Sequence, residues 1–243
     1  KEGEQEVRKN LPASNGHGST STSNLRLRLR RRRSCGVCRR ETLPPTLDSN
    51  SQPPNLWDGT TRLYISYICP YVQRVWIARN FKGLQDKIEL VAIDLQDKPA
   101  WFLEKVYPPG KVPVLEHKGN IIAESLDLLS YLEAHFEGLK VLPQDPAEQA
   151  FADELIGSSD SIIVALFRAG RAGGDGDGDG VREMVAPALD KDFFAAVKQY
   201  DMTQGRPKLK EWIEELNKID AYAATWGDRR LQIAAMMKKF GVI

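Results

Sequence analysis

Cys69 is the residue of this chain best placed for nucleophilic chemistry. It stands between a run of β-branched and aromatic residues at 61–67 and a segment with apolar residues at helical spacing at 72–81. Pro70 fits the first turn of that helix, where no backbone N–H is required. We therefore expect Cys69 at a helix N-terminus, where unpaired N–H groups and the helix dipole favour the thiolate and lower the pKa of the thiol. The alternative is a buried structural cysteine.

Two further motifs carry groups suited to a peptide-like ligand. Val112 precedes Pro113 at the start of a predicted strand, and a cis bond there would turn the Val112 backbone N–H and C=O toward the loop of Cys69. These groups could then hold an extended peptide as an added strand. Ser125 and the amides of the helix that follows it would suit a carboxylate, and Glu124 would suit an ammonium group. Ser125 alone could equally be an ordinary helix N-cap.

A thioredoxin-like arrangement would bring these motifs together around a zwitterionic thiol. The expected order of elements is β-α-β-α-β-β-α. The strands are predicted at 61–67, 87–95, 112–116 and 121–123, and the helices at 70–81, 99–106 and 125–136. The first crossover requires a parallel pair of strands, and the turn at 118–120 adds an antiparallel hairpin. In the last helix, one apolar face is expected to consist of Leu126, Leu129, Leu132 and Phe136.

Beyond a proline-containing linker at 142–146 the sequence becomes helical. Residues 147–167 form one candidate helix, and residues 207–219 form another. The second has apolar residues at helical spacing, namely Leu209, Trp212, Ile213, Leu216 and Ile219. The predicted fold class is α/β plus all-α, with a thioredoxin-like domain at 56–142 and a helical domain at 147–243.

Residues 1–55 differ in composition from the rest of the chain. The whole chain has a net charge of +1, yet residues 7–40 contain nine Arg and one Lys and no acidic residue. We predict a disordered basic tail, since no apolar period is sustained. An Arg- and Ser-rich stretch is also typical of an organelle transit peptide. Because no aromatic residues interleave with the arginines, we expect no nucleic-acid partner.

The cysteine count and hydropathy exclude several other classes. Three cysteines in 243 residues exclude a secreted disulfide scaffold and favour a reducing compartment. No apolar run approaches the length of a membrane span, so we expect no membrane partner. Cys35 and Cys38 form a C-x-x-C without a second pair at zinc spacing, and residues 175–180 match half of an EF-hand loop but lack its final Glu, replaced by Ala186. We therefore expect no metal.

The order and spacing of Cys69-Pro70-Tyr71, Val112-Pro113 and Glu124-Ser125 resemble those of plant lambda-class glutathione transferases. The resemblance runs from residue 55 to 155, with a further piece at 200–222. It implies a glutathione-binding, thioredoxin-like domain followed by a glutathione transferase-like helical domain. Members of this class continue past the equivalent of Asp190 into a buried helix, whereas Lys191 follows directly here. The resemblance thus implies a truncated helical domain that lacks part of its core.

The resemblance also assigns roles to the site residues, with glutathione as co-substrate. Val112, before a cis Pro113, would hold the cysteinyl backbone of glutathione. Glu124 and Ser125 would bind the γ-glutamyl end. Lys98 would bind the glycyl carboxylate, although a lysine in this loop is also an ordinary solvated charge.

By the same resemblance Cys69 is the catalytic nucleophile. A cysteine thiolate attacks sulfur and forms a mixed disulfide with glutathione. Val72 stands where a dithiol enzyme has its second cysteine, so a second glutathione must release the product. The expected function is thiol transfer in stress or xenobiotic detoxification, acting on small organic disulfides or glutathionyl conjugates.

Two other functions remain open at this point. One is dehydroascorbate reductase, which uses the same Cys-Pro helix start, and the other is a non-catalytic ligand-binding protein with an incomplete helical domain. We expect a monomer or weak dimer. The expected compartment is the cytoplasm, with the chloroplast as the alternative.

Overall fold

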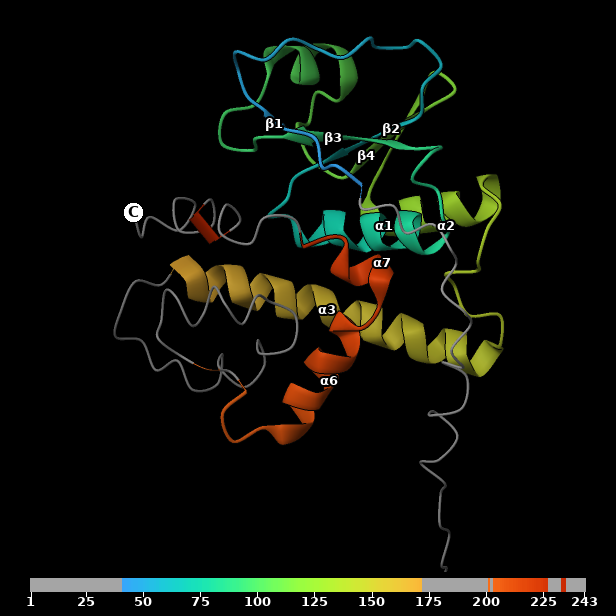
Figure 1. The fold of residues 1–243 in the computed structure, drawn as a ribbon, viewed down its shortest axis with the longest axis vertical. Coiled ribbons are helices and arrows are strands. Elements are labelled where there is room, and N and C mark those ends of the chain that lie inside the picture. Colours follow the sequence, from blue (N-terminus) through green and yellow to red (C-terminus); the bar gives the residue numbers. More distant parts are fainter. Residues whose placement is uncertain (1–40, 172–200, 202, 227–232, 235–243) are drawn as a thin grey trace, which may run out of the picture. The chain divides into compact units, whose positions relative to one another are not determined.

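The computed structural model describes residues 41–171, 201, 203–226 and 233–234. Their central feature is a five-stranded sheet in the order β1-β3-β2-β4-β5 (Figure 1). Its strands are β1 (Thr46–Leu47), β2 (Arg62–Ile65), β3 (Glu89–Ile93), β4 (Val114–His117) and β5 (Asn120–Ala123). β3 runs parallel to β1 and β2, whereas β4 runs antiparallel to β2 and β5. This mixed sheet confirms the thioredoxin-like arrangement.

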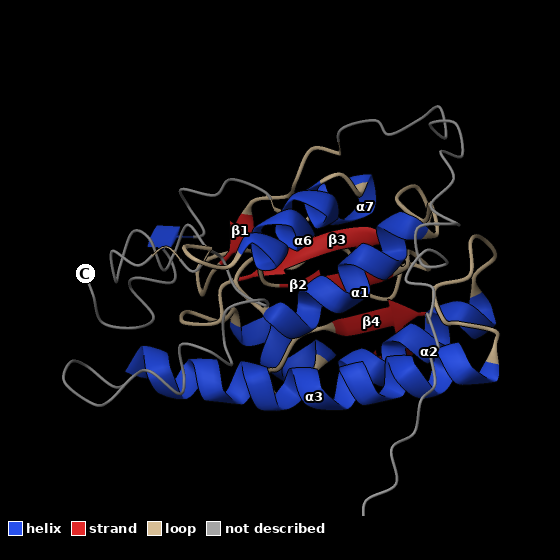
Figure 2. Cartoon of the chain, turned by 90° about the horizontal axis from the view of Figure 1, so that it is seen from below, coloured by secondary structure: helices blue, strands red, loops and turns tan. Residues whose placement is uncertain are grey.

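Helices cover both faces of the sheet. α1 (Pro70–Phe81) and α2 (Ser125–His135) contact each other on one face of the sheet (Figures 1 and 2). η2 (Phe102–Val106), a single π-helical turn, lies on the other face (Figure 1). All four residues of the central strand β2 are buried. The side chains that fill the two layers are almost all aliphatic or aromatic, including Leu63, Ile65, Val75, Phe102, Leu115 and Leu128. Burial of this apolar surface is what holds the strand of Cys69 against its helix.

The hairpin between β4 and β5 turns where the sequence predicts. Lys118 and Gly119 have φ of 52° and 75°, the pair of positive values that a two-residue type I′ turn requires. Glycine adopts such a φ without steric cost, and the twist of this turn matches that of the strands it joins. The hairpin therefore sets the β4–β5 register, with His117 opposite Asn120.

Residues 41–57, which we call the N-terminal strap, are ordered. The prediction of a disordered tail was therefore wrong for residues 41–55, and residues 1–40 lie outside the described part of the chain. The strap adds β1 to the sheet, with Thr46 opposite Ala92. Farther along the strap, Trp101 Nε1 donates to the Ser51 carbonyl at 2.9 Å and the Trp57 amide donates to Glu116 Oε1 at 2.9 Å. Such partners hold a segment that has no apolar period of its own.

The start of α2 also differs from the prediction. Glu124 is the residue preceding the helix and Ser125 is its first helical residue, without a side-chain cap bond. The buried face consists of Ser125, Leu128 and Leu132, whereas Leu126, expected on that face, is 38% exposed. The observed buried face is rotated relative to the predicted one because Ser125 packs inward. The other buried positions, Leu128 and Leu132, follow Ser125 at helical intervals of three and then four residues.

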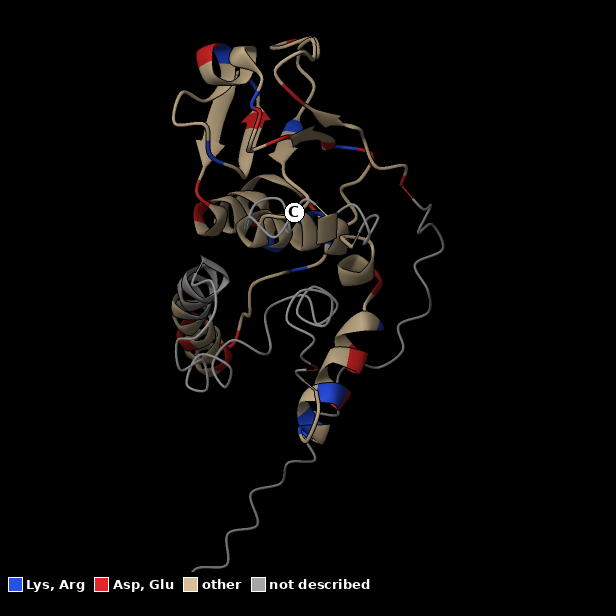
Figure 3. Cartoon of the chain, turned by 90° about the vertical axis from the view of Figure 1, so that its left-hand side faces the viewer, with Lys and Arg blue, Asp and Glu red and all other residues tan. Residues whose placement is uncertain are grey.

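The remaining described helices are α3 (Pro146–Arg171), α6 (Pro207–Asn217) and α7 (Asp220–Ala223). They confirm the helical character of this region, and α7 contacts both α1 and α6. α6 has no buried side chain, its Trp212 is 46% exposed, and acidic and basic residues are mixed along it (Figure 3). The predicted break at Asp190–Lys191 lies outside the described residues.

The described residues contain no helix that combines the length and the apolar character needed to cross a membrane. Nor, in these same ranges, do three or more His, Cys, Asp or Glu side chains gather as a metal ion would require. The C-x-x-C pair and the loop at 175–180 fall among the residues that are not described.

Candidate functional site

Cys69 lies at the N-terminus of α1, as its sequence context predicts. It is the N-cap residue, with extended backbone at φ −98° and ψ 115°, and Pro70 begins the helix. The Cys69 amide donates to the Ser66 carbonyl at 3.1 Å, and the Gln73 amide donates to the Cys69 carbonyl at 3.2 Å. The thiol is half-buried. The turn on one side and the helix on the other thus fix the backbone that carries the sulfur.

The second motif meets the first directly. The bond between Val112 and Pro113 is cis, as predicted. The Val112 carbonyl oxygen lies 3.8 Å from Cys69 Sγ, within range of a hydrogen bond donated by the thiol. The structure therefore brings together the predicted nucleophile and the backbone group expected to align a peptide-like ligand beside it.

The third motif lies at the start of α2, next to α1. Ser125 is buried, and Arg74 Nη1 donates to Ser125 Oγ at 3.4 Å. The Arg74 guanidinium also lies 5.2 Å from the centre of the Tyr71 ring, in cation–π range. Glu124 is exposed, with φ of 67°. A carboxylate that approached Ser125 would thus meet a guanidinium as well as the first amides of α2.

Lys98 lies in the loop after β3 and is half-buried. Its Nζ would be 3.4 Å from a Cβ placed on Gly110, which has φ of +64°. Gly110 stands two residues before Val112, so Lys98 lies beside the loop that leads into the second motif. Within the described ranges, Lys98 forms no hydrogen bond or ion pair with Glu124 or Ser125.

Arg74 and Tyr67 contact the site or its loop but did not emerge from the sequence. The only available signal for Arg74 was a cation between Gln73 and Val75 in the predicted helix. The contact itself requires knowing that α2 packs beside α1, which no local pattern reveals. The same holds for Tyr67, whose hydroxyl bonds to the N-terminal strap.

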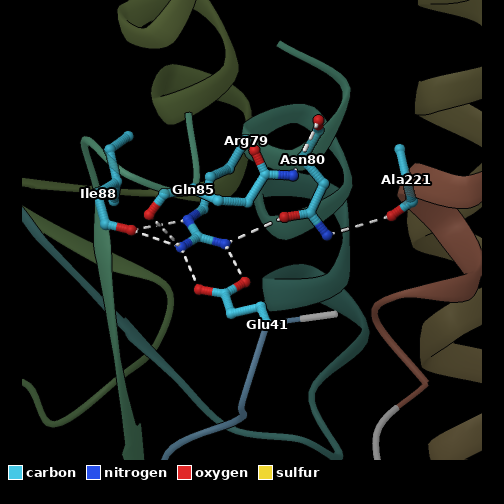
Figure 4. Close-up of polar contacts among 6 residues, drawn as sticks. All are labelled: Glu41, Arg79, Asn80, Gln85, Ile88 and Ala221. Atoms are coloured by element: carbon cyan, nitrogen blue, oxygen red, sulfur yellow. Dashed lines mark hydrogen bonds and ion pairs between the residues drawn. The ribbon is translucent and has the colours of Figure 1, made fainter. Parts of the chain in front are cut away.

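A polar cluster lies at the far end of α1 from Cys69 (Figure 4). Arg79 is fully buried and bonds both oxygens of Glu41 at 2.6 and 2.8 Å, a bidentate pair. Its Nε also donates to the Ile88 carbonyl at 2.8 Å. The adjacent Asn80 donates from Nδ2 to the Ala221 carbonyl at 3.3 Å. The cluster thus ties α1 to the N-terminal strap and to α7.

The comparisons with known proteins agree with this fold. Residues 63–140 match the family model described as Glutathione S-transferase, N-terminal domain. A solved structure of rice GST1 in complex with glutathione is similar in fold, with a TM-score of 0.57 and 22% identity, covering 75% of this chain and 98% of the rice chain.

Sequence relatives extend the similarity over most of the chain. Protein IN2-1 homolog A of Oryza sativa subsp. japonica is 46% identical over 217 residues, covering 78% of this chain and 89% of the relative. Glutathione S-transferase L3 of Arabidopsis thaliana is 43% identical, covering 82% of this chain and 96% of the relative. Glutathione S-transferase L2, chloroplastic, from the same plant is also 43% identical, covering 76% of this chain and 72% of the relative. With its fold, its site motifs and these relatives, the chain belongs to the lambda class of plant glutathione transferases.

Proposed function

We propose that this chain is a glutathione-dependent thiol transferase that works through a mixed disulfide at Cys69. The observation that carries the proposal is the cysteine at the N-terminus of α1, with Cys69 Sγ 3.8 Å from the Val112 carbonyl. A helix N-terminus stabilises a thiolate, and a thiolate is the form that attacks a disulfide. A hydroxyl in its place would be unable to form the disulfide.

We further propose how glutathione lies in the site. Its cysteinyl backbone would pair with Val112 as an added strand, which directs its sulfur toward Cys69. Its γ-glutamyl carboxylate would meet Ser125 and Arg74, and its ammonium would meet Glu124. Its glycyl carboxylate would pair with Lys98. A rice protein of similar fold is in complex with glutathione, which supports glutathione as the ligand.

The proposed reaction has two balanced steps. The Cys69 thiolate attacks the glutathionyl sulfur of a mixed disulfide, the original S–S bond breaks, and the substrate leaves as a thiolate. The thiolate of free glutathione then attacks the same sulfur, which releases oxidised glutathione and restores the Cys69 thiolate. Val72 occupies the place where a resolving cysteine would interrupt this second step.

The first test compares Cys69→Ser with the double variant Cys35→Ser, Cys38→Ser. Reduction of 2-hydroxyethyl disulfide by glutathione should be lost in the first and kept in the second. Mass spectrometry after exposure to oxidised glutathione should show one glutathione, on Cys69. Activity that survives in Cys69→Ser but disappears in the double variant would contradict the assignment, as would a disulfide between Cys69 and either tail cysteine.

The same preparations separate the alternatives. Dehydroascorbate offered as the oxidant tests for dehydroascorbate reductase, because that reaction also requires Cys69 but gives ascorbate. A protein that binds glutathione yet transfers no thiol would instead be a ligand-binding protein. A fluorescent fusion of the whole chain tests the compartment, for which we propose the cytoplasm and, given the relative named chloroplastic, the chloroplast as the alternative.

A further inference from the structure

The N-terminal strap meets the loop of Cys69 through the side chain of Tyr67. The Tyr67 hydroxyl donates to the Pro44 carbonyl at 2.5 Å. The Tyr67 ring also packs on Trp76 of α1, with ring centres 5.8 Å apart and planes inclined by 50°. Tyr67 is therefore held between the strap on one side and the helix of the nucleophile on the other.

Tyr67 is also part of the turn that presents Cys69. The bond from the Cys69 amide to the Ser66 carbonyl closes a four-residue turn, in which Tyr67 and Ile68 are the central residues. The dihedral angles of the central residues of a turn determine where its last residue points. A displacement of Tyr67 would thus reorient Cys69 relative to the first amides of α1.

The acceptor of the Tyr67 hydroxyl is itself anchored on both sides. Before Pro44, the carboxylate of Glu41 binds the buried Arg79. After Pro44, Thr46 and Leu47 pair with β3. The Pro44 carbonyl is consequently a fixed point against which the hydroxyl of Tyr67 can align the turn.

We propose that Tyr67 is a positioning residue for Cys69, held by its hydrogen bond to the Pro44 carbonyl of the N-terminal strap. This inference rests on the proposed function, since it takes Cys69 to be the reactive thiol. Burial and the nearby Glu41 carboxylate raise the pKa of Tyr67 to about 12. The phenol therefore keeps its proton, and the hydrogen bond, throughout the range in which a cysteine titrates.

The test is Tyr67→Phe, made in the Cys35→Ser, Cys38→Ser background so that Cys69 alone reacts. Its matched control is Tyr131→Phe, which removes a hydroxyl of a half-buried tyrosine in the same domain, one that lies 3.0 Å from His117 Nδ1. Both changes keep the aromatic ring, so the packing of Tyr67 on Trp76 is retained. The rate of Cys69 alkylation by iodoacetamide is measured against pH, together with the melting temperature and kcat/KM.

In Tyr67→Phe the midpoint of the alkylation profile should rise toward the free-thiol value of about 8.5. Its kcat/KM should fall about fivefold, the effect of one neutral hydrogen bond. Tyr131→Phe should lower the melting temperature similarly but leave the midpoint unchanged. An unchanged or lowered midpoint in Tyr67→Phe, with only the melting temperature reduced, would overturn the inference. Because alkylation needs no glutathione, a raised midpoint in a chain without thiol transfer would refute the proposed function alone.

Discussion

At the scale of single residues, Glu124 stands out as a local conflict beside the candidate site. Its φ of 67° and ψ of 122° place a residue with a Cβ in a region that few residues other than glycine occupy. Such a conformation costs roughly 1–3 kcal/mol and persists only where the surroundings impose it. Glu124 is the single residue between the end of β5 at Ala123 and the start of α2 at Ser125. The exposed Glu124 carboxylate is thereby held at the N-terminus of α2.

We predict that Glu124→Gly is more stable than Glu124→Ala by about 1 kcal/mol, measured by urea unfolding, because only glycine relieves the backbone conflict. Both variants should bind glutathione more weakly than the unmodified chain in calorimetric titrations, since both lose the carboxylate. An alanine variant as stable as the glycine variant would mean that no strain is stored at this position.

The sequence predicts those site residues whose signals are local. Cys69 follows a strand and precedes Pro70, and Pro113 interrupts a strand, so their positions follow from nearest neighbours. The sequence offers Ser125 as a possible N-cap of α2, whereas the observed cap is Glu124, because serine is the commoner N-cap and the sequence gives no sign of the positive φ of Glu124. Arg74 and Tyr67 depend on contacts between separate elements and were not predictable in this way.

At the scale of elements, α1 is the helix on which the other parts converge. It carries Cys69 at one end and the fully buried Arg79 near the other. A buried cation is tolerated only if it is paired and hydrogen-bonded, and Arg79 has both Glu41 and backbone carbonyls. The helix is thus anchored at its far end to the N-terminal strap.

We predict that Arg79→Gln destabilises the chain by about 3 kcal/mol, because it removes the fully buried partner of a half-buried ion pair and leaves the Ile88 carbonyl without its charged donor. Lys140→Gln serves as the control. Lys140 pairs with Glu133 at 3.5 Å but is 63% exposed, so its loss should cost at most about 0.5 kcal/mol. Urea denaturation measures both, and equal small losses would show that the Arg79 cluster contributes little.

Elements with a strong local sequence pattern or a characteristic turn were predicted well. An element that exists only because it pairs with a distant strand was not. β2, β3, α1 and the β4–β5 hairpin follow from runs of β-forming apolar residues, helical spacing and a Lys-Gly turn. β1 has two residues in a stretch rich in Pro, Ser and Asn, so it exists because β3 offers an unpaired edge. No property of the strap sequence alone indicates that pairing.

At the scale of the whole described chain, burial is distributed unevenly. The sheet and the helices α1 and α2 enclose a dense core, whereas α6 has only half-buried and exposed side chains. Phe151 and Leu155 of α3 are 59% and 54% exposed. The alignment to the rice relative is 217 residues long but covers 78% of this 243-residue chain, so part of the relative has no counterpart here. The truncation of the helical domain stays a prediction.

We predict that backbone amides in 61–136 exchange slowly with solvent and that those in 207–217 exchange quickly. An isolated helix of this length is marginal in water, and α6 lacks the buried contacts that would stabilise it. Hydrogen exchange followed by mass spectrometry measures both regions, with size-exclusion chromatography to record the oligomeric state, proposed to be a monomer or weak dimer. Equal, strong protection in a monomer would show that the helical region has a complete core.

The polar cluster of α1 has a consequence for the order in which the protein acquires its structure during synthesis. Glu41 is translated before Arg79, so the buried cation finds its counter-charge as soon as α1 has left the ribosome. Asn80 meets Ala221 across 141 residues of chain, so this contact must wait until α7 has been synthesised. The nascent thioredoxin-like domain can therefore neutralise its interior charge before α7 is available to dock on α1.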